Sequence, residues 1–388
     1  MNVKEMKLKH KSLNDIIFVI FFCLILMLPI SHISQKGSSA IEYRRLAKYY
    51  PLLSDKGVNL NYGKNFDKYF EDRFFLRDII IGLFQTGLSK INHFISNKLI
   101  VFNTKNSWFF EKIELEQSKV KNEKNILSAL QQLNVFAQKH HIKLYLLIVP
   151  SKIDFYQEYN GLYNKLPKIQ YGNTIHFLKK NLSFPIIFPH ESLEKAKSSD
   201  FIYFKTDHHW TEWGAYIGYQ ELMKIIKKDF HDIPIITEDD FKIFYDRRVF
   251  HTSSGFFGGV SLMRSHIDTD MFILDTPYKY YQPKLKLKIT STNKSKYRTQ
   301  EFQNLNKTTK LRAILAGTSM GDYLSIFLPH SFKSLKYFRM NSVRDVPAAD
   351  EYKLLKRYEK DILTYKPDIL VLVFSTRNLT GLSNLIRK

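Results

Sequence analysis

The stretch Lys143-Leu-Tyr-Leu-Leu-Ile-Val149 is a nearly continuous apolar run that ends at Pro150. Such a run is typical of a strand that is buried on both faces of a parallel sheet. Three further runs have the same character, at residues 184–188, 311–316 and 368–374. These four segments predict the sheet around which the chain folds.

Helical patterns separate the predicted strands. Apolar residues recur at helical spacing in residues 126–136, 213–228 and 346–365. Strands that alternate with helices predict an α/β fold with a doubly wound, mainly parallel sheet flanked by helices. Residues 230–300 fit this alternation poorly, and we interpret them as an insertion or lid. Residues 293–307, which overlap the end of this insertion, are typical of an exposed loop.

The chain has 388 residues, which exceeds the roughly 250–300 at which single hydrophobic cores stop growing. We therefore expect three parts: a cytoplasmic tail and signal anchor at residues 1–34, a stalk and amphipathic helical region at 35–120, and a main domain at 121–388. Aromatic residues recur at helical spacing from Phe66 onwards, which predicts an amphipathic helix that continues to about residue 95.

The N-terminus carries a basic flank followed by an apolar run from Ile16 to Ile30. The run falls short of the roughly 20 residues that a straight spanning helix needs, although its flanks lengthen it to a marginal span. A cleaved signal peptide is the alternative, but the residues after the run offer no convincing cleavage site. We favour an uncleaved signal anchor, which by the positive-inside rule places the chain after residue 34 outside the cytoplasm.

The formal net charge of +22 is large. The lysines are spread along the whole chain, and no zinc-finger, RRM or homeodomain pattern is present, so we do not favour a nucleic-acid partner. Attraction to anionic surface polymers or lipid headgroups accounts for the charge at least as well. The single cysteine, Cys23, excludes an intramolecular disulfide.

Two motifs carry reactive groups. Gly317-Thr-Ser-Met-Gly321 places Ser319 in a strand-to-helix turn, where its hydroxyl can stand clear and backbone N–H groups can face a developing oxyanion. Asp207 and His209 lie two residues apart, so an extended backbone would project both to one side, with His208 pointing away. The Asp207 carboxylate could then orient the His209 imidazole toward the Ser319 hydroxyl, which activates a serine nucleophile. By itself, however, a serine after a strand is often only a cap or turn residue.

The same segment allows other interpretations. A metal site made by Asp207, His208 and His209 is one, but adjacent histidines cannot easily both reach one ion from a strand, so we predict no metal. Trp210 is expected either to fix the loop by packing or to contact a sugar substrate. Glu212 is expected to be a solvated or helix-start carboxylate rather than a second catalytic acid.

Thr206-Asp-His-His-Trp-Thr-Glu-Trp-Gly-Ala215 resembles the DHHW motif of the alginate O-acetyltransferase family, which has an SGNH-hydrolase-like fold. Residues 66–78, the Pro-x-Lys element within 146–152 and the Gly-Thr-Ser element at 317–320 are also similar to segments of that family. The chain departs from the family at Asn106-Ser-Trp-Phe-Phe110, where the family often has Gly-x-x-Gly-Trp-Leu-Phe.

The resemblance implies that Asp207, His209 and Ser319 form a catalytic triad, in the permuted chain order Asp, His, Ser. Arg377 and Asn378 fall where the family often has a polar pair, and we consider them candidates for binding substrate, although a structural salt bridge accounts for them equally well.

The implied activity is an extracytoplasmic, membrane-anchored O-acetyltransferase that acts on a polysaccharide. The resemblance also implies that its acetyl group would come from a membrane-bound O-acyltransferase partner. The chain has no P-loop or Rossmann fingerprint, and we predict no cofactor of its own. An esterase of the same fold is the main alternative. A membrane-tethered polysaccharide-binding factor with a vestigial site is the non-enzymatic one.

Overall fold

The computed structural model describes residues 15–23, 46–55, 57–74, 77, 80, 94–96, 100–103, 108–111, 120, 122–159, 171–205, 207–246, 277–292, 299–306, 309–340 and 352–386. The chain divides into two compact units. One comprises residues 1–95 and 252–272, and the other comprises residues 96–251 and 273–388.

A seven-stranded sheet forms the centre of the second unit, in the order β10-β11-β13-β12-β14-β6-β7. The five strands from β13 to β7 pair in parallel, whereas β10, β11 and β13 pair antiparallel at one edge. The strands span β6 (Lys143–Val149), β7 (Ile186–Ile187), β10 (Leu287–Thr292), β11 (Thr299–Asn304), β12 (Arg312–Gly317), β13 (Ser334–Arg339) and β14 (Ile369–Ser375). The prediction of a mainly parallel sheet is confirmed.

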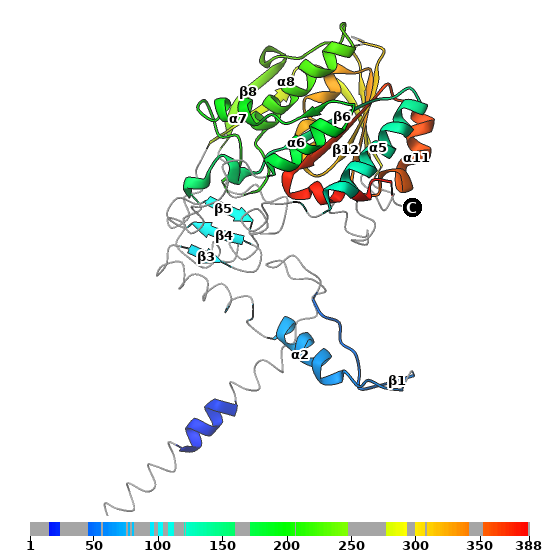
Figure 1. Ribbon diagram of the computed structural model, residues 1–388. Coiled ribbons are helices and arrows are strands. Elements are labelled where there is room, and N and C mark those ends of the chain that lie inside the picture. The colour runs from blue at the N-terminus through cyan, green and yellow to red at the C-terminus, as the bar shows by residue number, and fades with distance from the viewer. Residues whose placement is uncertain are drawn as a thin grey trace, which may run out of the picture. The chain divides into compact units, whose positions relative to one another are not determined.

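Helices flank this sheet on both faces (Figure 1). They are α5 (Glu123–Lys139), α6 (Gly172–Asn181), α7 (His190–Ala196), α8 (Glu212–Asp229), α10 (Met320–Leu324) and α11 (Leu354–Tyr365). Alternate residues of β6 separate the two faces: Leu144 and Leu146 join the core with α5, α6 and α11, whereas the Tyr145 hydroxyl donates a hydrogen bond to Asp229 at the end of α8. This alternation is what a strand buried on both sides requires.

The predicted insertion at 230–300 contains regular structure. The strands β8 (Phe241–Asp246) and β9 (Tyr278–Pro283) form an antiparallel pair, and β10 and β11 extend the main sheet. The expectation of an exposed loop at 293–307 was wrong for residues 299–304, which form β11. That strand is polar in sequence because only Phe302 and Asn304 among its residues are buried.

A smaller sheet of β3 (Phe94–Ser96), β4 (Ile100–Asn103) and β5 (Trp108–Glu111) precedes the main domain. The prediction of a helix that continues to about residue 95 was wrong at residues 94 and 95, which belong to β3; residues 81–93 lie outside the described residues. The Trp108 side chain of β5 is buried, and its ring stacks on Tyr159 at a centroid distance of 4.9 Å.

The first unit contains the helix α2 (Tyr62–Arg73) and the short pair β1 (Leu53–Ser54) and β2 (Gly57–Val58). The Arg73 guanidinium donates to the Ala47 carbonyl at 3.2 Å, and the Ala47 N–H donates to the Asp72 carboxylate at 2.7 Å. These two bonds tie the segment before α2 to the end of that helix.

Residues 15–23 are helical. Within the described part of the chain, no helix combines the length and the apolar character that crossing a membrane requires. Residues 24–45, which include the rest of the predicted anchor, lie outside the described residues, so the anchor stays a prediction.

Candidate active site

Ser319 lies where β12 ends and α10 begins, as the glycines around it predicted. The preceding Gly317 allows the backbones of β12 and β14 to approach closely, because a Cβ atom there would lie 2.0 Å from the Val373 carbonyl oxygen of β14. The Thr318 N–H donates to that same oxygen at 3.0 Å. The turn is therefore fastened to the neighbouring parallel strand, and it holds Ser319 at the carboxyl end of the sheet.

Tyr337 of β13 supports the same turn from the other side. Its hydroxyl forms hydrogen bonds with the Thr318 carbonyl at 2.8 Å and with the Asp322 carboxylate at 3.0 Å. Asp322 also pairs with Arg339. A Cβ atom on Gly321 would lie 2.8 Å from the Tyr337 ring, so glycine is needed for this contact.

The candidate acid and base lie on a loop of residues 204, 205 and 207–210, which we call the acid–base loop. Its ends are joined by a bridge between Tyr203 and Trp210 and by a 3.2 Å bond from the Phe204 N–H to the His209 carbonyl. The loop leads directly into α8, where the Thr211 hydroxyl caps the helix by accepting from the Gly214 N–H at 3.1 Å.

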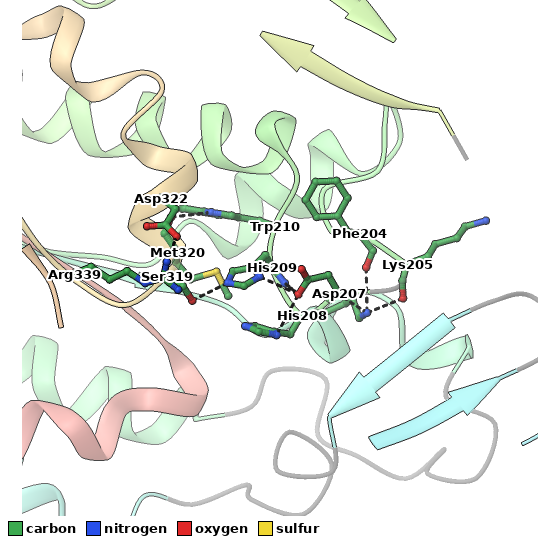
Figure 2. Close-up of polar contacts among 11 residues, drawn as sticks. Phe204, Lys205, Asp207, His208, His209, Trp210, Ser319, Met320, Asp322 and Arg339 are labelled. Atoms are coloured by element: carbon green, nitrogen blue, oxygen red, sulfur yellow. Dashed lines mark hydrogen bonds and ion pairs between the residues drawn. The ribbon is translucent and has the colours of Figure 1, made fainter. Parts of the chain in front are cut away.

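The structure brings Asp207, His209 and Ser319 into one hydrogen-bonded row (Figure 2). His209 Nε2 lies 2.7 Å from Ser319 Oγ, and His209 Nδ1 lies 2.9 Å from Asp207 Oδ1. All three side chains are buried, with Ser319 the most exposed at 6 %. The arrangement fits a neutral imidazole whose Nδ1–H donates to the carboxylate and whose Nε2 accepts from the serine hydroxyl.

His208 does not point away, as an extended backbone would require. Its Nδ1 lies 3.2 Å from Asp207 Oδ1, and its ring centroid lies 3.9 Å from that of His209. The expectation was wrong because residues 207–209 form a bend, not an extended strand. One carboxylate oxygen therefore faces both imidazoles.

Burial sets the charges of this group. Burial alone raises the pKa of the Asp207 carboxyl, but the two neighbouring imidazoles and the hydrogen bonds from His209 outweigh it and hold that pKa below its usual range. Burial, with a further contribution from His209, lowers the pKa of His208 to about 3. Near neutral pH the carboxylate is therefore ionised and the His208 imidazole is uncharged.

The ligand atoms of Asp207, His208 and His209 lie within 4.8 Å of one another, so this trio could in principle hold an ion. However, both Nδ1 atoms already face the carboxylate oxygen, and His209 Nε2 faces Ser319. A metal ion would have to displace the hydrogen bonds that His209 makes with Asp207 and Ser319. The geometry suits proton transfer better than metal binding, and the prediction of no metal remains a prediction.

Comparison with known proteins finds a family match over part of this site, which includes Asp207 and His209 but not Ser319. Residues 101–243 match the family described as the SGNH hydrolase-like domain of acetyltransferase AlgX. Over these residues the chain is similar to that SGNH hydrolase-like acetyltransferase domain. The family that the DHHW motif predicted is thus confirmed. Among curated proteins, none matches the chain by sequence.

The similarity to solved structures covers more of the chain than the family match does. Bacillus cereus PatB1, solved with a sulfonyl adduct, shares 18 % sequence identity and has a TM-score of 0.53, and the match covers 75 % of this chain and 100 % of that chain. A DHHW family protein from Eubacterium siraeum shares 13 % identity with a TM-score of 0.52, covering 75 % of this chain and 97 % of that chain. These identities support a shared fold, and the fold alone.

Trp210 was a candidate either for packing in the loop or for contacting substrate; the structure shows packing contacts, and substrate contact by Trp210 stays a prediction. The side chain is fully buried, and its indole N–H donates to the Met320 carbonyl at 3.1 Å. Trp210 therefore joins the acid–base loop to the first turn of α10, next to Ser319. Glu212 begins α8, as predicted, but it is not simply solvated, because its carboxylate accepts from the Tyr281 N–H at 2.7 Å.

Arg377 and Asn378 follow β14 in a 3₁₀ helix (Thr376–Asn384), and both are partly buried. The Asn378 side chain is engaged within the protein: it accepts from the Ser375 hydroxyl at 2.7 Å and donates to the Tyr352 hydroxyl at 3.1 Å. Burial lowers the pKa of Arg377 to about 10, so its guanidinium remains charged at neutral pH. Substrate binding by this pair stays a prediction.

Two residues near the site were not recognised as functional candidates from the sequence. Tyr337 belongs to β13, which mixes apolar and basic residues and gave no strand signal. Lys152 stands in the Pro-x-Lys element, and its burial at 1 % exposure was not expected. Its place in the Pro-x-Lys element, three residues after the end of a buried strand, is a local signal that could have drawn attention to it.

Proposed function

We propose that this protein is an O-acetyltransferase that carries an acetyl group on Ser319 and delivers it to a hydroxyl of a polysaccharide. The observation that carries the proposal is the buried row in which His209 Nε2 lies 2.7 Å from Ser319 Oγ and His209 Nδ1 lies 2.9 Å from Asp207 Oδ1. The family of the SGNH hydrolase-like domain supports acetyl transfer as the reaction class.

In the first half-reaction, Ser319 Oγ attacks the carbonyl carbon of the acetyl donor while its proton passes to His209 Nε2. The tetrahedral intermediate then collapses, and the leaving group departs with the proton from His209. Asp207 remains ionised throughout and stabilises the imidazolium that forms between the two proton transfers. The product is an acetyl ester on Ser319.

In the second half-reaction, a sugar hydroxyl gives its proton to His209 Nε2 and attacks the ester carbonyl. The bond between the acetyl carbon and Ser319 Oγ breaks, and the serine recovers its proton from the imidazolium. Atoms and charges balance without any cofactor. Water in place of the sugar hydroxyl would complete the same cycle as an esterase.

Both tetrahedral intermediates place negative charge on the former carbonyl oxygen, which needs N–H donors. The N–H groups of Gly321 and Asp322 are already bonded to the Thr318 and Ser319 carbonyls at 3.0 Å each. We therefore assign this role to N–H groups earlier in the turn, those of Ser319 and Met320. Their immediate proximity to the nucleophile supports the assignment.

The sequence supports the setting of this reaction. The basic flank and apolar run at the N-terminus suit a signal anchor with the catalytic domain outside the cytoplasm. There the acetyl group would be supplied by a membrane-bound O-acyltransferase partner, and the net charge of +22 suits an anionic glycan as acceptor.

The experiment follows an acetyl group from donor to acceptor. The purified full-length protein is incubated with p-nitrophenyl acetate and candidate polysaccharides, and acetylated glycan is measured beside free acetate. Acetylated glycan that depends on Ser319 supports the transferase. Free acetate alone, with every acceptor tested, favours the esterase instead.

The test variant is Ser319→Ala, and Ser331→Ala is its matched control. Ser331 is a fully buried serine that hydrogen-bonds the Tyr219 hydroxyl at 2.8 Å. Loss of acetylation in Ser319→Ala but not in Ser331→Ala is expected. If a folded Ser319→Ala protein acetylates glycans at the rate of the wild type, the acyl-enzyme proposal fails and the non-enzymatic binding factor becomes the better interpretation.

A further inference from the structure

Lys152 is a fully enclosed cation that the proposed reaction does not use. Pro150 and Ser151 separate it from the end of β6, and it begins a 3₁₀ turn (Lys152–Asp154). That turn is fixed at its base: the Ser151 N–H donates to the Asp154 carboxylate at 3.0 Å, and the Ser151 hydroxyl lies 2.7 Å from the Thr376 hydroxyl. The lysine backbone is therefore anchored to the central sheet.

The ammonium group of Lys152 donates three hydrogen bonds to main-chain carbonyls. They go to Phe204 at 3.1 Å, to Lys205 at 3.0 Å and to Asp207 at 2.9 Å. A protonated lysine has three N–H donors, whereas a neutral amine has two, so this set of three acceptors requires the charged form. Every acceptor lies on the acid–base loop, at or just before the catalytic carboxylate.

Aromatic rings cover the same cation from another side. The Lys152 ammonium lies 5.5 Å from the ring centroid of Trp108 and 5.1 Å from that of Phe110, both on β5. Both rings are buried, at 1 % exposure. Cation–π attraction strengthens when water is excluded, so β5 helps to hold the charge against the loop.

The position of these bonds decides what they do. The loop bends sharply at residues 207–209, and the Asp207 side chain reaches His209 Nδ1 only while its own backbone is held in place. The Asp207 carbonyl is one of the three acceptors, so the lysine fixes the same residue whose carboxylate orients the base. Its positive charge also lies in the electrostatic surroundings of His208.

We propose that Lys152 is a positioning residue whose buried ammonium holds the acid–base loop in the conformation that joins Asp207, His209 and Ser319. This inference rests on the proposed function, since it assigns the lysine to the geometry of that same triad. It differs from a role in general stability because it ties the reactivity of Ser319 to the hydrogen bond between Asp207 and His209.

The test uses Lys152→Met and Lys152→Arg with two readouts. The first is the rate at which phenylmethylsulfonyl fluoride labels Ser319, followed by intact mass; Ser319 Oγ bonds the sulfur, fluoride leaves, and the hydroxyl proton passes to His209. The second is the low-field proton resonance of His209 Nδ1–H bonded to Asp207. In Lys152→Met we expect labelling to slow about 100-fold, the effect of a misplacement of about 1 Å, and the resonance to disappear.

Lys197→Met is the matched control. Lys197 also donates to a main-chain carbonyl, that of Phe155, and lies 4.7 Å from the Tyr156 ring centroid, but it does not contact the acid–base loop in the described structure. Its loss should leave the labelling rate within a factor of about 3 of the wild type. Thermal unfolding of each variant confirms that the labelled protein is folded.

The proposal requires the labelling rate of Ser319 and the His209 Nδ1–H resonance to change together in every folded variant of Lys152. If Lys152→Met does not fold, Lys152→Arg serves as the test. The positioning role is overturned, while the triad stands, by either of two results. One is a folded variant that keeps the wild-type labelling rate but loses the resonance, or the reverse; the other is a Lys152→Met protein labelled at the rate of the wild type. If the wild type itself is labelled no faster than Ser319→Ala, the proposed function fails first.

Discussion

Asp207→Asn is the substitution that tests the proposed chemistry most directly, because it removes one charge and little volume. In the wild type, the carboxylate oxygen lies 2.9 Å from His209 Nδ1 and the side chain is fully buried. When His209 takes the proton from Ser319, the imidazolium forms beside this anion. An asparagine cannot supply the charge, and its amide can favour the wrong imidazole tautomer.

The distance gives the expected size of the effect. Two unit charges 2.9 Å apart attract by about 6 kcal/mol at an effective dielectric constant of about 20. Because each 1.36 kcal/mol corresponds to roughly tenfold in rate, full loss of this term would slow the reaction by about 10,000-fold. Some charge is spread over both carboxylate oxygens, so we expect a loss of about 1,000- to 10,000-fold in kcat/KM.

The assay is acetyl release from p-nitrophenyl acetate at neutral pH, corrected for the background reaction and for the folded fraction. Asp229→Asn is the control, since Asp229 accepts a hydrogen bond from Tyr145 but lies at the far end of α8 from the loop. A folded Asp207→Asn protein that loses less than about tenfold would refute the role of the buried carboxylate as the partner of His209.

Three further substitutions test separate features. Gly321→Ala should slow acetyl release and lower the free energy of unfolding by about 1–3 kcal/mol, because its Cβ would lie 2.8 Å from the Tyr337 ring; unfolding in urea and the esterase assay measure both effects. Trp210→Phe should destabilise the protein by about 1–3 kcal/mol through loss of the bond to the Met320 carbonyl without raising the KM for glycan selectively; a selective rise in that KM would support Trp210 as a substrate contact. The pKa of His208, about 3 in the folded protein against an ordinary value of 6.5, means that the unfolded chain binds a proton first as the pH falls. Stability is therefore lost between these two values, and His208→Asn should reduce the slope of unfolding free energy against pH by about 1.4 kcal/mol per pH unit near pH 5; an unchanged slope would contradict a buried neutral imidazole.

The sequence was informative wherever one local pattern determined the structure. The apolar run 143–149 predicted a strand buried on both faces, and in the structure all of its residues except the first are buried. Ser319 could be placed because glycines mark its turn, and the close approach of Gly317 to β14 shows why that position excludes a side chain. The strands β11 and β13 were missed because they lie toward the antiparallel edge and carry polar residues, so they lack the continuous apolar pattern of the central strands.

The candidate site shows a similar division. The two-residue spacing of Asp207 and His209 identified a pair that does meet, but the rule behind it assumes an extended backbone. The actual bend brings His208 to the same carboxylate, which the rule excluded. Lys152 contacts carbonyls 52 to 55 positions further along the chain, and such contacts arise only from tertiary packing. Sequence spacing predicted the reacting groups better than it predicted what holds them.

The charges of the site explain why burial favours the proposed reaction. At rest, the enclosed region holds the Asp207 anion and the Lys152 cation, while His208 is uncharged. Formation of the tetrahedral intermediate adds one positive charge on His209 and one negative charge on the acetyl oxygen, so the total charge does not change. A buried site resists a change in net charge more than a separation of charge between groups that already face each other. The arrangement therefore favours the step in which Ser319 loses its proton to His209 while it attacks, and it disfavours a free serine alkoxide beside a neutral base.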